Sequence, residues 1–289
     1  MKNFIYKKLP TLEEVCGLLS QDPEKTKILA GGTELLVKMK SKLLEPEIII
    51  DLKGISGLDE IGYDQNEGLT IGPLATFQSL ETAKIIQEKF GVISETAGQF
   101  GSIQIRNLAT LGGHLCNASP ASDMAPCLIS LGATIRIMGS EGKRWIPLEE
   151  FFTGPGKTVL KKGEILTSVQ VPNIPEKTGC VYMKHSLRKA MDMAIVGVAT
   201  AITLDKGKER IEEIKIVLGA VSPIPMRAQK AEGRLRGTRI DKISIDEASR
   251  LASEEARPIM DLHGSAEYRK EMVRVITKKS IRQAMDDIL

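Results

Sequence analysis

The sequence predicts an α+β protein built from two domains. Its 289 residues exceed the usual size of a single domain, which is about 100–200 residues. Strand signals separated by short turns between residues 180 and 221 are typical of an antiparallel sheet. Helix signals dominate from residue 244 onward. Because the pattern changes near residues 172–178, we expect domains at 1–174 and 175–289.

Helix and strand signals alternate in the first domain. The capping-box sequence Thr11-Leu12-Glu13-Glu14 predicts a helix that ends near Pro23. Further helices are expected over residues 34–42 and 77–90, and residues 98–113 are expected to form an ordered loop that serves a ligand. Apolar runs predict strands at 28–30, 48–52, 69–72, 133–138 and 165–171.

The second domain is expected to begin with strands and to end with helices. Strands are predicted at 180–185, 194–204 and 214–221, where short turn sequences separate the apolar runs. A second capping box, Ser244-Ile245-Asp246-Glu247, predicts a helix to about Ala256. A last helix is expected to start near Ser265, with its apolar residues on roughly one side.

Composition excludes several classes of protein. The charges are interspersed and sum to a formal +3, so nucleic acid is not expected as a partner. No stretch approaches the roughly 18 apolar residues of a transmembrane helix, and the N-terminal segment lacks the apolar core of a signal peptide. We therefore expect a cytoplasmic protein. The four cysteines are far apart, so neither a disulfide framework nor a metal site is indicated.

Two paired-glycine turns are the main candidates for a binding site. They are Ala30-Gly31-Gly32-Thr33 and Thr110-Leu111-Gly112-Gly113. Paired glycines allow close backbone approach, so that successive N–H groups can converge on an anion such as a pyrophosphate. A single pair of glycines is more often only a tight turn, so the argument depends on there being two.

Known nucleotide and hydrolase motifs are missing. No G-x-G-x-x-G follows a strand, and Gly156-Lys157-Thr158 lacks the first P-loop glycine because Phe151 stands there. There is no H-E-x-x-H or G-x-S-x-G, and only three histidines occur. We expect neither a catalytic side chain nor a metal ligand on this chain.

A polar run follows the second glycine turn. It extends from His114 through Asn117 and Ser119 to Asp123, and it precedes an apolar helix through Leu131. Its small hydrogen-bonding side chains suit the hydroxyl groups of a ribityl or ribose. The alternative is a polar loop in which Ser119 or Ser122 caps the helix and Asp123 interacts with the helix dipole.

Several segments of the sequence together resemble a known protein family. Ala30-Gly31-Gly32-Thr33-Glu34-Leu35-Leu36, Ile71-Gly72-Pro73-Leu74-Ala75-Thr76 and the run from Ile105 to Asp123 resemble the FAD-binding medium subunit of the xanthine dehydrogenase and carbon monoxide dehydrogenase family. Lys184 and the segment from Arg188 to Val198 resemble the start of its C-terminal flavoprotein domain. The resemblance implies a two-part FAD-binding domain of the vanillyl-alcohol-oxidase/MurB-like (PCMH) type, split near residue 55, and a smaller α+β domain after it.

The resemblance also implies which residues bind FAD. One wall of the site would comprise the first turn with the strand before it, namely Ile28, Leu29, Ala30, Gly31, Gly32, Thr33, Glu34 and Leu35. The second turn would supply Thr110, Leu111, Gly112, Gly113 and His114. Asn117 and Asp123 would add polar contacts, Leu166 an apolar one and Lys184 a cation, although a strand lysine is as often a solvated charge.

Two of the implied contacts have alternatives or departures. Phe100 matches an aromatic contact of some family members, but a core phenylalanine is equally compatible with its sequence. The position of His114 is often asparagine in the family, so FAD affinity is expected to depend on pH in the histidine range.

The implied function is electron transfer within a complex. Electrons would arrive from two [2Fe–2S] clusters on a small subunit, which receives them from a large molybdenum-cofactor subunit, and would leave through FAD to NAD or another acceptor. A dimer of heterotrimers is expected. The alternatives are a stand-alone FAD-dependent oxidoreductase and a scaffold subunit that has lost its cofactor.

Overall fold

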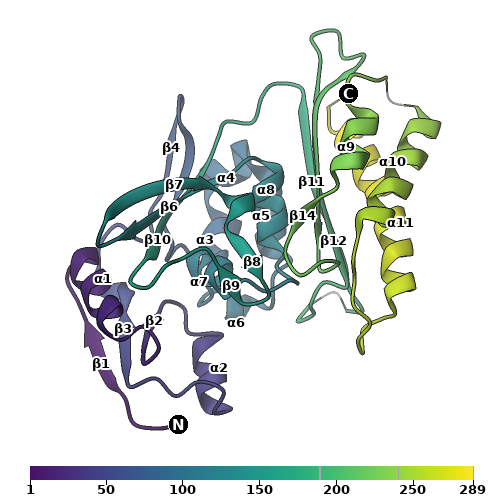
Figure 1. The fold of residues 1–289 in the computed structure, drawn as a ribbon. Coiled ribbons are helices and arrows are strands. Elements are labelled where there is room, and N and C mark those ends of the chain that lie inside the picture. The colour runs from purple at the N-terminus through teal and green to yellow at the C-terminus, as the bar shows by residue number, and fades with distance from the viewer. Residues whose placement is uncertain (189, 240, 289) are drawn as a thin grey trace.

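The computed structural model describes residues 1–188, 190–239 and 241–288. Lys189, within the segment that resembles the start of the second domain, lies outside the described residues. Figure 1 shows an N-terminal part of three small layers and a C-terminal part in which helices cover one face of a sheet. The α+β prediction, with an antiparallel sheet near the C-terminus, is confirmed.

The chain begins with a small parallel sheet. Its strand order is β1-β3-β2, and α1 packs against β2. Thr11 caps α1 by accepting a hydrogen bond from the Glu14 N–H, as its sequence predicts. The elements of this part are β1 (Ile5–Lys8), α1 (Leu12–Gln21), β2 (Thr26–Leu29), α2 (Leu35–Lys40), β3 (Ile48–Asp51) and the 3₁₀ turn η1 (Leu52–Gly54). Residue 55 therefore lies between this sheet and the next.

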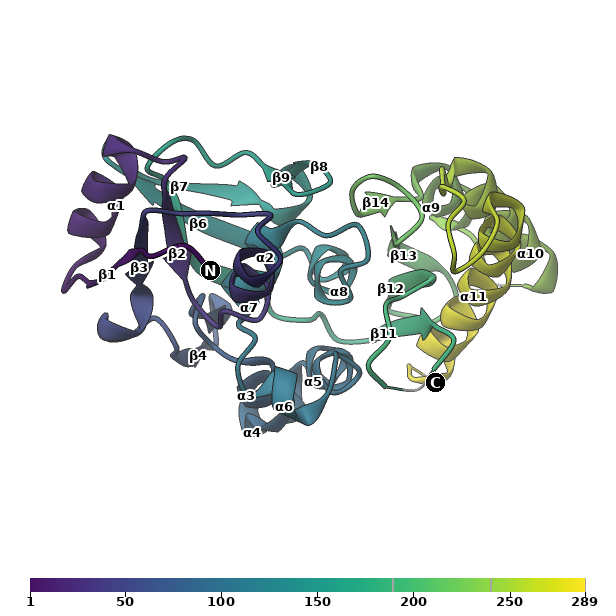
Figure 2. The same cartoon turned by 90° about the horizontal axis from the view of Figure 1, so that it is seen from below.

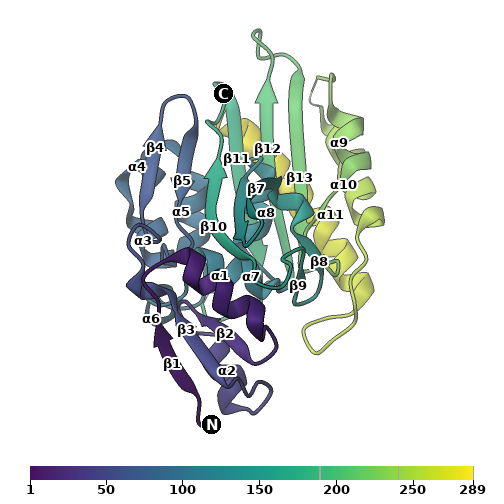
Figure 3. The ribbon, with the colours of Figure 1, turned by 60° about the vertical axis from the view of Figure 1, so that its left-hand side comes forward.

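A five-stranded antiparallel sheet follows, with strand order β4-β5-β10-β6-β7. Its strands are β4 (Ile61–Asp64), β5 (Gly68–Ile71), β6 (Thr134–Gly139), β7 (Gly142–Pro147) and β10 (Ile165–Val171). Between β5 and β6 the chain forms α3 (Phe77–Thr82), α4 (Lys84–Lys89), α5 (Gly91–Gly98), α6 (Ile103–Arg106), α7 (Leu111–Asn117) and α8 (Met124–Ser130). The turn η2 (Leu148–Glu150) and the hairpin β8 (Phe152–Gly154) and β9 (Lys157–Thr158) precede β10. Figure 3 shows the two N-terminal sheets one above the other.

The C-terminal sheet is antiparallel, with order β11-β12-β13-β14. Its outer face is covered by three helices, while α8 packs against β12 and β13 from the other side (Figure 2). The elements are β11 (Thr178–His185), β12 (Val196–Leu204), β13 (Ile211–Gly219), β14 (Met226–Arg227), α9 (Gln229–Leu235), α10 (Lys242–Glu255) and α11 (Ala266–Asp286). One apolar core thus runs from the N-terminal part onto Tyr182, Ala199 and Val217.

Several local predictions are wrong. The helix expected over 77–90 is broken at Ala83, whose extended ψ of 118° interrupts it. The second capping box is formed by Asp241 and Ser244, because α10 starts before Ser244 and places that serine three residues after the cap. The expected loop at 98–113 contains α6 and the start of α7. Strands β1, β4 and β7 and helix α9 were not predicted; β1 is exposed along its whole length, so its sequence carries no alternation.

Candidate functional site

A cavity of about 390 Å³ lies where the two N-terminal sheets meet, between the end of β2, the start of α2, helix α7 and the start of β10. This volume is within the range of sites that bind organic cofactors. Most residues predicted for the site line it: Ile28, Ala30, Gly31, Gly32, Thr33, Glu34, Leu35, Phe100, Thr110, Gly112, Gly113, His114, Asn117 and Leu166. Segments from four distant parts of the sequence therefore meet at one cavity.

Four predicted residues do not line this cavity: Leu29, Leu111, Asp123 and Lys184. Leu111 is the first residue of α7, and its side chain is fully buried in the apolar core. Asp123 and Lys184 form a buried ion pair instead. Lys184 also lines a second cavity of about 330 Å³, together with Gln99, His185, Ser186, Leu187, Arg188, Ala190 and Asp192.

The first glycine turn has the features expected of an anion site. A Cβ added at Gly31 would lie 1.9 Å from the carbonyl oxygen of Leu108, so only glycine allows this approach of two backbone segments. Gly32 has φ +74°, in the left-handed region. Among the hydrogen bonds of the described residues, none has the N–H of Gly32, Thr33 or Glu34 as its donor. These N–H groups are available to a ligand in the cavity.

The second glycine pair differs from the first in that its N–H groups have partners within the chain. Gly112 and Gly113 lie in the first turn of α7, and their N–H groups already donate to the Pro73 oxygen at 2.8 Å and to the Thr110 hydroxyl at 3.2 Å. These two N–H groups are therefore already paired within the chain, whereas Gly112 and Gly113 themselves line the cavity. A Cβ at Gly112 would lie 2.6 Å from the Pro73 Cβ, so this glycine allows α7 to approach residue 73 closely.

An aromatic group forms one end of the cavity. The rings of Phe77 and Phe100 are stacked with centroids 4.0 Å apart, and His114 meets both edge-on at 5.1 Å. The His114 Nε2 lies 2.6 Å from the Ser122 hydroxyl. Burial, with a smaller contribution from the positive charge of Lys184, lowers the pKa of His114 to about 4. His114 is therefore neutral at physiological pH.

The low pKa of His114 makes stability depend on pH. An unfolded histidine binds a proton near pH 6.5, whereas folded His114 does so only near pH 4. The unfolded state therefore holds more protons between these values, and stability falls as the pH drops from about 6.5 to 4. Urea unfolding of the wild type and of His114→Asn measures this effect. As the pH drops through this window, we expect the free energy of unfolding of the wild type to fall by about 1–3 kcal/mol relative to that of the variant. If the free energy of unfolding depended on pH in the same way in both proteins, the low pKa of His114 would be contradicted.

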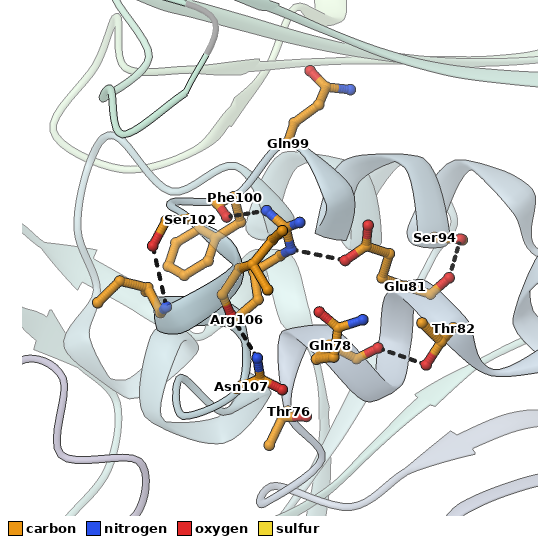
Figure 4. Close-up of polar contacts among 12 residues, drawn as sticks. Thr76, Gln78, Glu81, Thr82, Ser94, Gln99, Phe100, Ser102, Arg106 and Asn107 are labelled. Atoms are coloured by element: carbon orange, nitrogen blue, oxygen red, sulfur yellow. Dashed lines mark hydrogen bonds and ion pairs between the residues drawn. The ribbon is translucent and has the colours of Figure 1, made fainter.

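Arg106 fixes the segment that carries Phe100. Its side chain is largely buried; the Nε donates to Glu81 at 2.7 Å and the NH1 donates to the carbonyl oxygen of Phe100 at 3.2 Å. Figure 4 shows this guanidinium between α3 and the chain leading from α5 to α6. Ser102 caps α6 by accepting from the Ile105 N–H. The arginine thus positions the cavity's aromatic end.

We expect Arg106→Gln to lower the free energy of unfolding by about 1–3 kcal/mol, because it leaves Glu81 and a carbonyl oxygen without their donor. Lys84→Gln is the matched control, since Lys84 forms an exposed pair with Glu88 that contributes little. Urea denaturation of both variants measures the difference. Equal stability of the two would show that the Arg106 contacts are energetically neutral.

A buried polar group joins the two parts of the chain. Asp123, at the start of α8, accepts from the Tyr182 hydroxyl at 2.7 Å and from the Lys184 ammonium at 2.8 Å. Burial raises the pKa of Asp123, while the positive charge of Lys184 and the two hydrogen bonds oppose that rise. Lys184 therefore pairs with a buried carboxylate, and it is not the solvated charge that the sequence left open as the alternative to a cofactor contact.

The sequence did not reveal a set of further cavity residues. They are Lys27, Lys38, Leu44, Leu52, Pro73, Leu74, Ala109, Cys116, Leu160, Glu164 and Ile165. Lys38 pairs with Glu34 and donates to the Asn117 side chain at 3.0 Å, so it connects two walls of the cavity. The sequence signal for this pairing was the position of Lys38 one helical turn after Glu34. Burial raises the pKa of the Cys116 thiol to about 12, which makes it unreactive.

Within the described part of the chain, no three His, Cys, Asp or Glu side chains are grouped to hold a metal ion. None of the helices described there is long and apolar enough to cross a membrane.

Known proteins resemble the whole of this chain. Residues 2–174 match the family described as the FAD binding domain in molybdopterin dehydrogenase, and residues 181–284 match the CO dehydrogenase flavoprotein C-terminal domain. The chain is 34% identical to the glyceraldehyde dehydrogenase medium chain of Sulfolobus acidocaldarius, over 97% of this chain and 98% of that one. It is 32% identical to the carbon monoxide dehydrogenase medium chain of Afipia carboxidovorans, over 98% and 96%.

A solved structure has the same fold as this chain over its full length. Carbon monoxide dehydrogenase from Hydrogenophaga pseudoflava superposes with a TM-score of 0.95 at 29% identity, covering 100% of this chain and 99% of that one. The cavity, the first glycine turn and the full-length matches thus point the same way, and the chain belongs to the FAD-binding medium subunits of the molybdenum hydroxylases of the carbon monoxide dehydrogenase and xanthine dehydrogenase family.

Proposed function

We propose that this subunit carries electrons from the metal centres of its complex to NAD or another acceptor, using FAD held in the 390 Å³ cavity. The observation that carries the proposal is the first glycine turn. Gly32, Thr33 and Glu34 line the cavity, and their N–H groups donate to no acceptor among the hydrogen bonds of the described residues. Such free N–H groups bind the oxygens of a pyrophosphate.

The other cavity residues fit the rest of an FAD molecule. We propose that the pyrophosphate lies along residues 31–35, with Ile28 and Ala30 beside it. Thr110, His114 and Asn117 offer polar side chains on the facing wall, where Gly113 leaves room for the cofactor, and Leu166 and Phe100 offer apolar surface. Leu29, Leu111 and Gly112 support these walls through packing. Asp123 and Lys184 are proposed to hold the second domain against the cofactor site through their ion pair.

FAD supplies redox chemistry that protein side chains lack. The chain's own contribution is to bind the cofactor, to orient it and to exclude water from it. The neutral ring of His114 forms a hydrogen bond with the Ser122 hydroxyl and adds no charge to the site. The pH dependence of FAD affinity predicted from the sequence therefore shifts from the ordinary histidine range to about pH 4.

The relatives support the proposed partners. Two of them are named medium chains of a glyceraldehyde and a carbon monoxide dehydrogenase, and a medium chain has larger and smaller companions. We propose a small subunit with two [2Fe–2S] clusters and a large molybdenum-cofactor subunit, arranged as a dimer of heterotrimers, with NAD or another acceptor. The four cysteines are free thiols, which suits the reducing cytoplasm that we propose as its compartment.

We also propose that the chain divides at 174/175 into two domains, with the first split near residue 55. The exposed Pro172 and the segment to Lys177 connect β10 with β11. Limited proteolysis of the full chain is expected to cut first in this segment. One apolar core includes residues from both sides of this segment. If the first cuts fell elsewhere, the two parts would behave as one folding unit, and the division would be contradicted.

Rapid anaerobic reduction of the purified complex tests the electron path. With the iron–sulfur subunit present, the substrate of the complex should bleach the flavin absorbance. The isolated chain with the same substrate should remain oxidised. Bleaching of the isolated chain would favour a stand-alone oxidoreductase, and failure to bind FAD in either setting would favour a scaffold.

A further inference from the structure

The two ring nitrogens of His114 face different surroundings. Nε2 lies 2.6 Å from the Ser122 hydroxyl, whereas no hydrogen bond between described residues involves Nδ1. In the described part of the chain, Nδ1 is also not one of the fully buried polar atoms that lack a partner. It is therefore accessible, and the side chain that carries it lines the cofactor cavity. One nitrogen is thus bound to the protein and the other is open to the cavity.

Neighbouring aromatic rings fix the orientation of the imidazole. Its plane lies at 75° to that of Phe77 and at 85° to that of Phe100, with both centroids 5.1 Å away. A half-turn about the Cβ–Cγ bond would place a carbon atom at the position of Nε2, and the hydrogen bond with Ser122 would be lost. The two nitrogens therefore keep separate roles.

Ser122 determines which nitrogen carries the proton. It is 2% exposed, and its oxygen already accepts the Ala125 N–H at 3.1 Å. Among the described residues, His114 is the only partner to which this hydroxyl can donate, and a buried hydroxyl without an acceptor is costly. The Ser122 hydroxyl therefore donates to Nε2. Because the hydrogen bond of one imidazole nitrogen sets the protonation of the other, the neutral ring carries its proton on Nδ1.

This tautomer offers the cavity an uncharged N–H donor. The free N–H groups of Gly32, Thr33 and Glu34 belong to the same cavity. A Cβ added at Gly113, the residue before His114, would lie 3.8 Å from the Ala30 Cβ, so the start of α7 adjoins the first glycine turn. Donors from two walls therefore surround one space, which suits a ligand rich in acceptor oxygens.

Resting on the proposed function, we propose that the His114 Nδ1–H donates a hydrogen bond to an oxygen of the bound FAD, and that Ser122 is the positioning residue that keeps the proton on this nitrogen. Ser122 contributes through its hydroxyl alone, because its oxygen is already bound to the protein on both sides. Its removal should therefore change the tautomer of His114 before it changes anything else in the cavity.

Nitrogen NMR of the full chain with labelled histidine tests the tautomer. The chain has three histidines, and His114→Asn identifies the His114 signals by their loss. At neutral pH and without FAD, we expect a protonated Nδ1 and an unprotonated Nε2 in the wild type. Ser122→Ala should lose this preference. Ser119→Ala is the matched control, because the Ser119 hydroxyl accepts from the Ala121 N–H. A wild-type proton on Nε2, or an unchanged tautomer in Ser122→Ala, would overturn the inference.

The affinity for FAD tests the donor. The amide of asparagine can place an N–H at the position of Nδ1, whereas that of glutamine reaches the position of Nε2 and phenylalanine keeps a ring without a donor. We expect the Kd for FAD to stay within about threefold of wild type in His114→Asn and to rise about tenfold or more in His114→Gln and His114→Phe, as for the loss of one hydrogen bond. Cooperative urea unfolding of each variant shows that it folds.

The outcomes separate this inference from the proposed function. If His114→Gln and His114→Phe bind FAD as tightly as the wild type, or if His114→Asn loses as much affinity as His114→Phe, the donor role is overturned while FAD binding stands. A wild-type chain that binds no FAD, alone or in its complex, would overturn the proposed function and the donor role with it. The NMR spectra of the FAD-free chain would still decide whether Ser122 sets the tautomer.

Discussion

Gly31→Ala is expected to abolish FAD binding and to destabilise the chain. The new methyl group would lie 1.9 Å from the Leu108 oxygen and 2.8 Å from its carbonyl carbon. Neither contact involves a flexible side chain, so the backbone of the first glycine turn must move. Overpacking of this kind costs about 1–3 kcal/mol or more. The displaced turn would no longer align the N–H groups of Gly32 and Thr33, so flavin absorbance should be lost during purification.

Gly17→Ala is the matched control. Gly17 lies within α1, and a Cβ there meets nothing within 4 Å. Alanine in a helix is favoured over glycine by about 0.5–1 kcal/mol. This variant should therefore retain FAD and gain slightly in stability. If Gly31→Ala binds FAD as tightly as Gly17→Ala, the first turn does not contact the cofactor.

Lys184→Met is expected to lower the free energy of unfolding by about 3–5 kcal/mol at neutral pH, because it leaves a buried carboxylate without its cation. The Lys184 and Asp123 side chains are only 7% and 4% exposed. The loss should shrink in acid, since burial already raises the pKa of Asp123 and a group whose folded pKa is raised stabilises the fold below that pKa. Urea titrations at pH 5 and pH 8 measure both effects.

Two comparisons sharpen this prediction. Glu254→Gln removes an exposed helical pair with Arg250 and should change stability by no more than about 0.5 kcal/mol. The double variant Lys184→Met with Asp123→Leu should be more stable than Lys184→Met alone, because it removes the uncompensated charge. A double variant as unstable as the sum of its single changes would show that the pair is not coupled.

Local patterns predicted much of the site. The first glycine turn could be recognised because positive φ and close backbone approach restrict the residue to glycine. Close backbone approach applies at Gly31 and positive φ at Gly32. The second pair looked the same in sequence but serves helix packing. Whether glycine N–H groups are free depends on Pro73 and Thr110, and a sequence pattern does not show those partners.

Long-range contacts escaped prediction for a related reason. Asp123 and Lys184 are 61 positions apart, and their pairing follows from the packing of α8 against the C-terminal sheet. Glu164 and Leu160 reach the cavity through the segment before β10, which has no motif of its own. Helix and strand types were largely predictable where apolar periodicity is strong, as in β12 and α11, and failed at exposed elements such as β1 and β7.

The most direct test of the account is the absorbance spectrum of the purified chain, followed by identification of the chromophore released on denaturation. We predict flavin bands and about one FAD per chain, lost in Gly31→Ala and retained in Gly17→Ala. A colourless chain that takes up no FAD, either alone or in its complex, would contradict the central claim that the cavity beside the first glycine turn binds this cofactor.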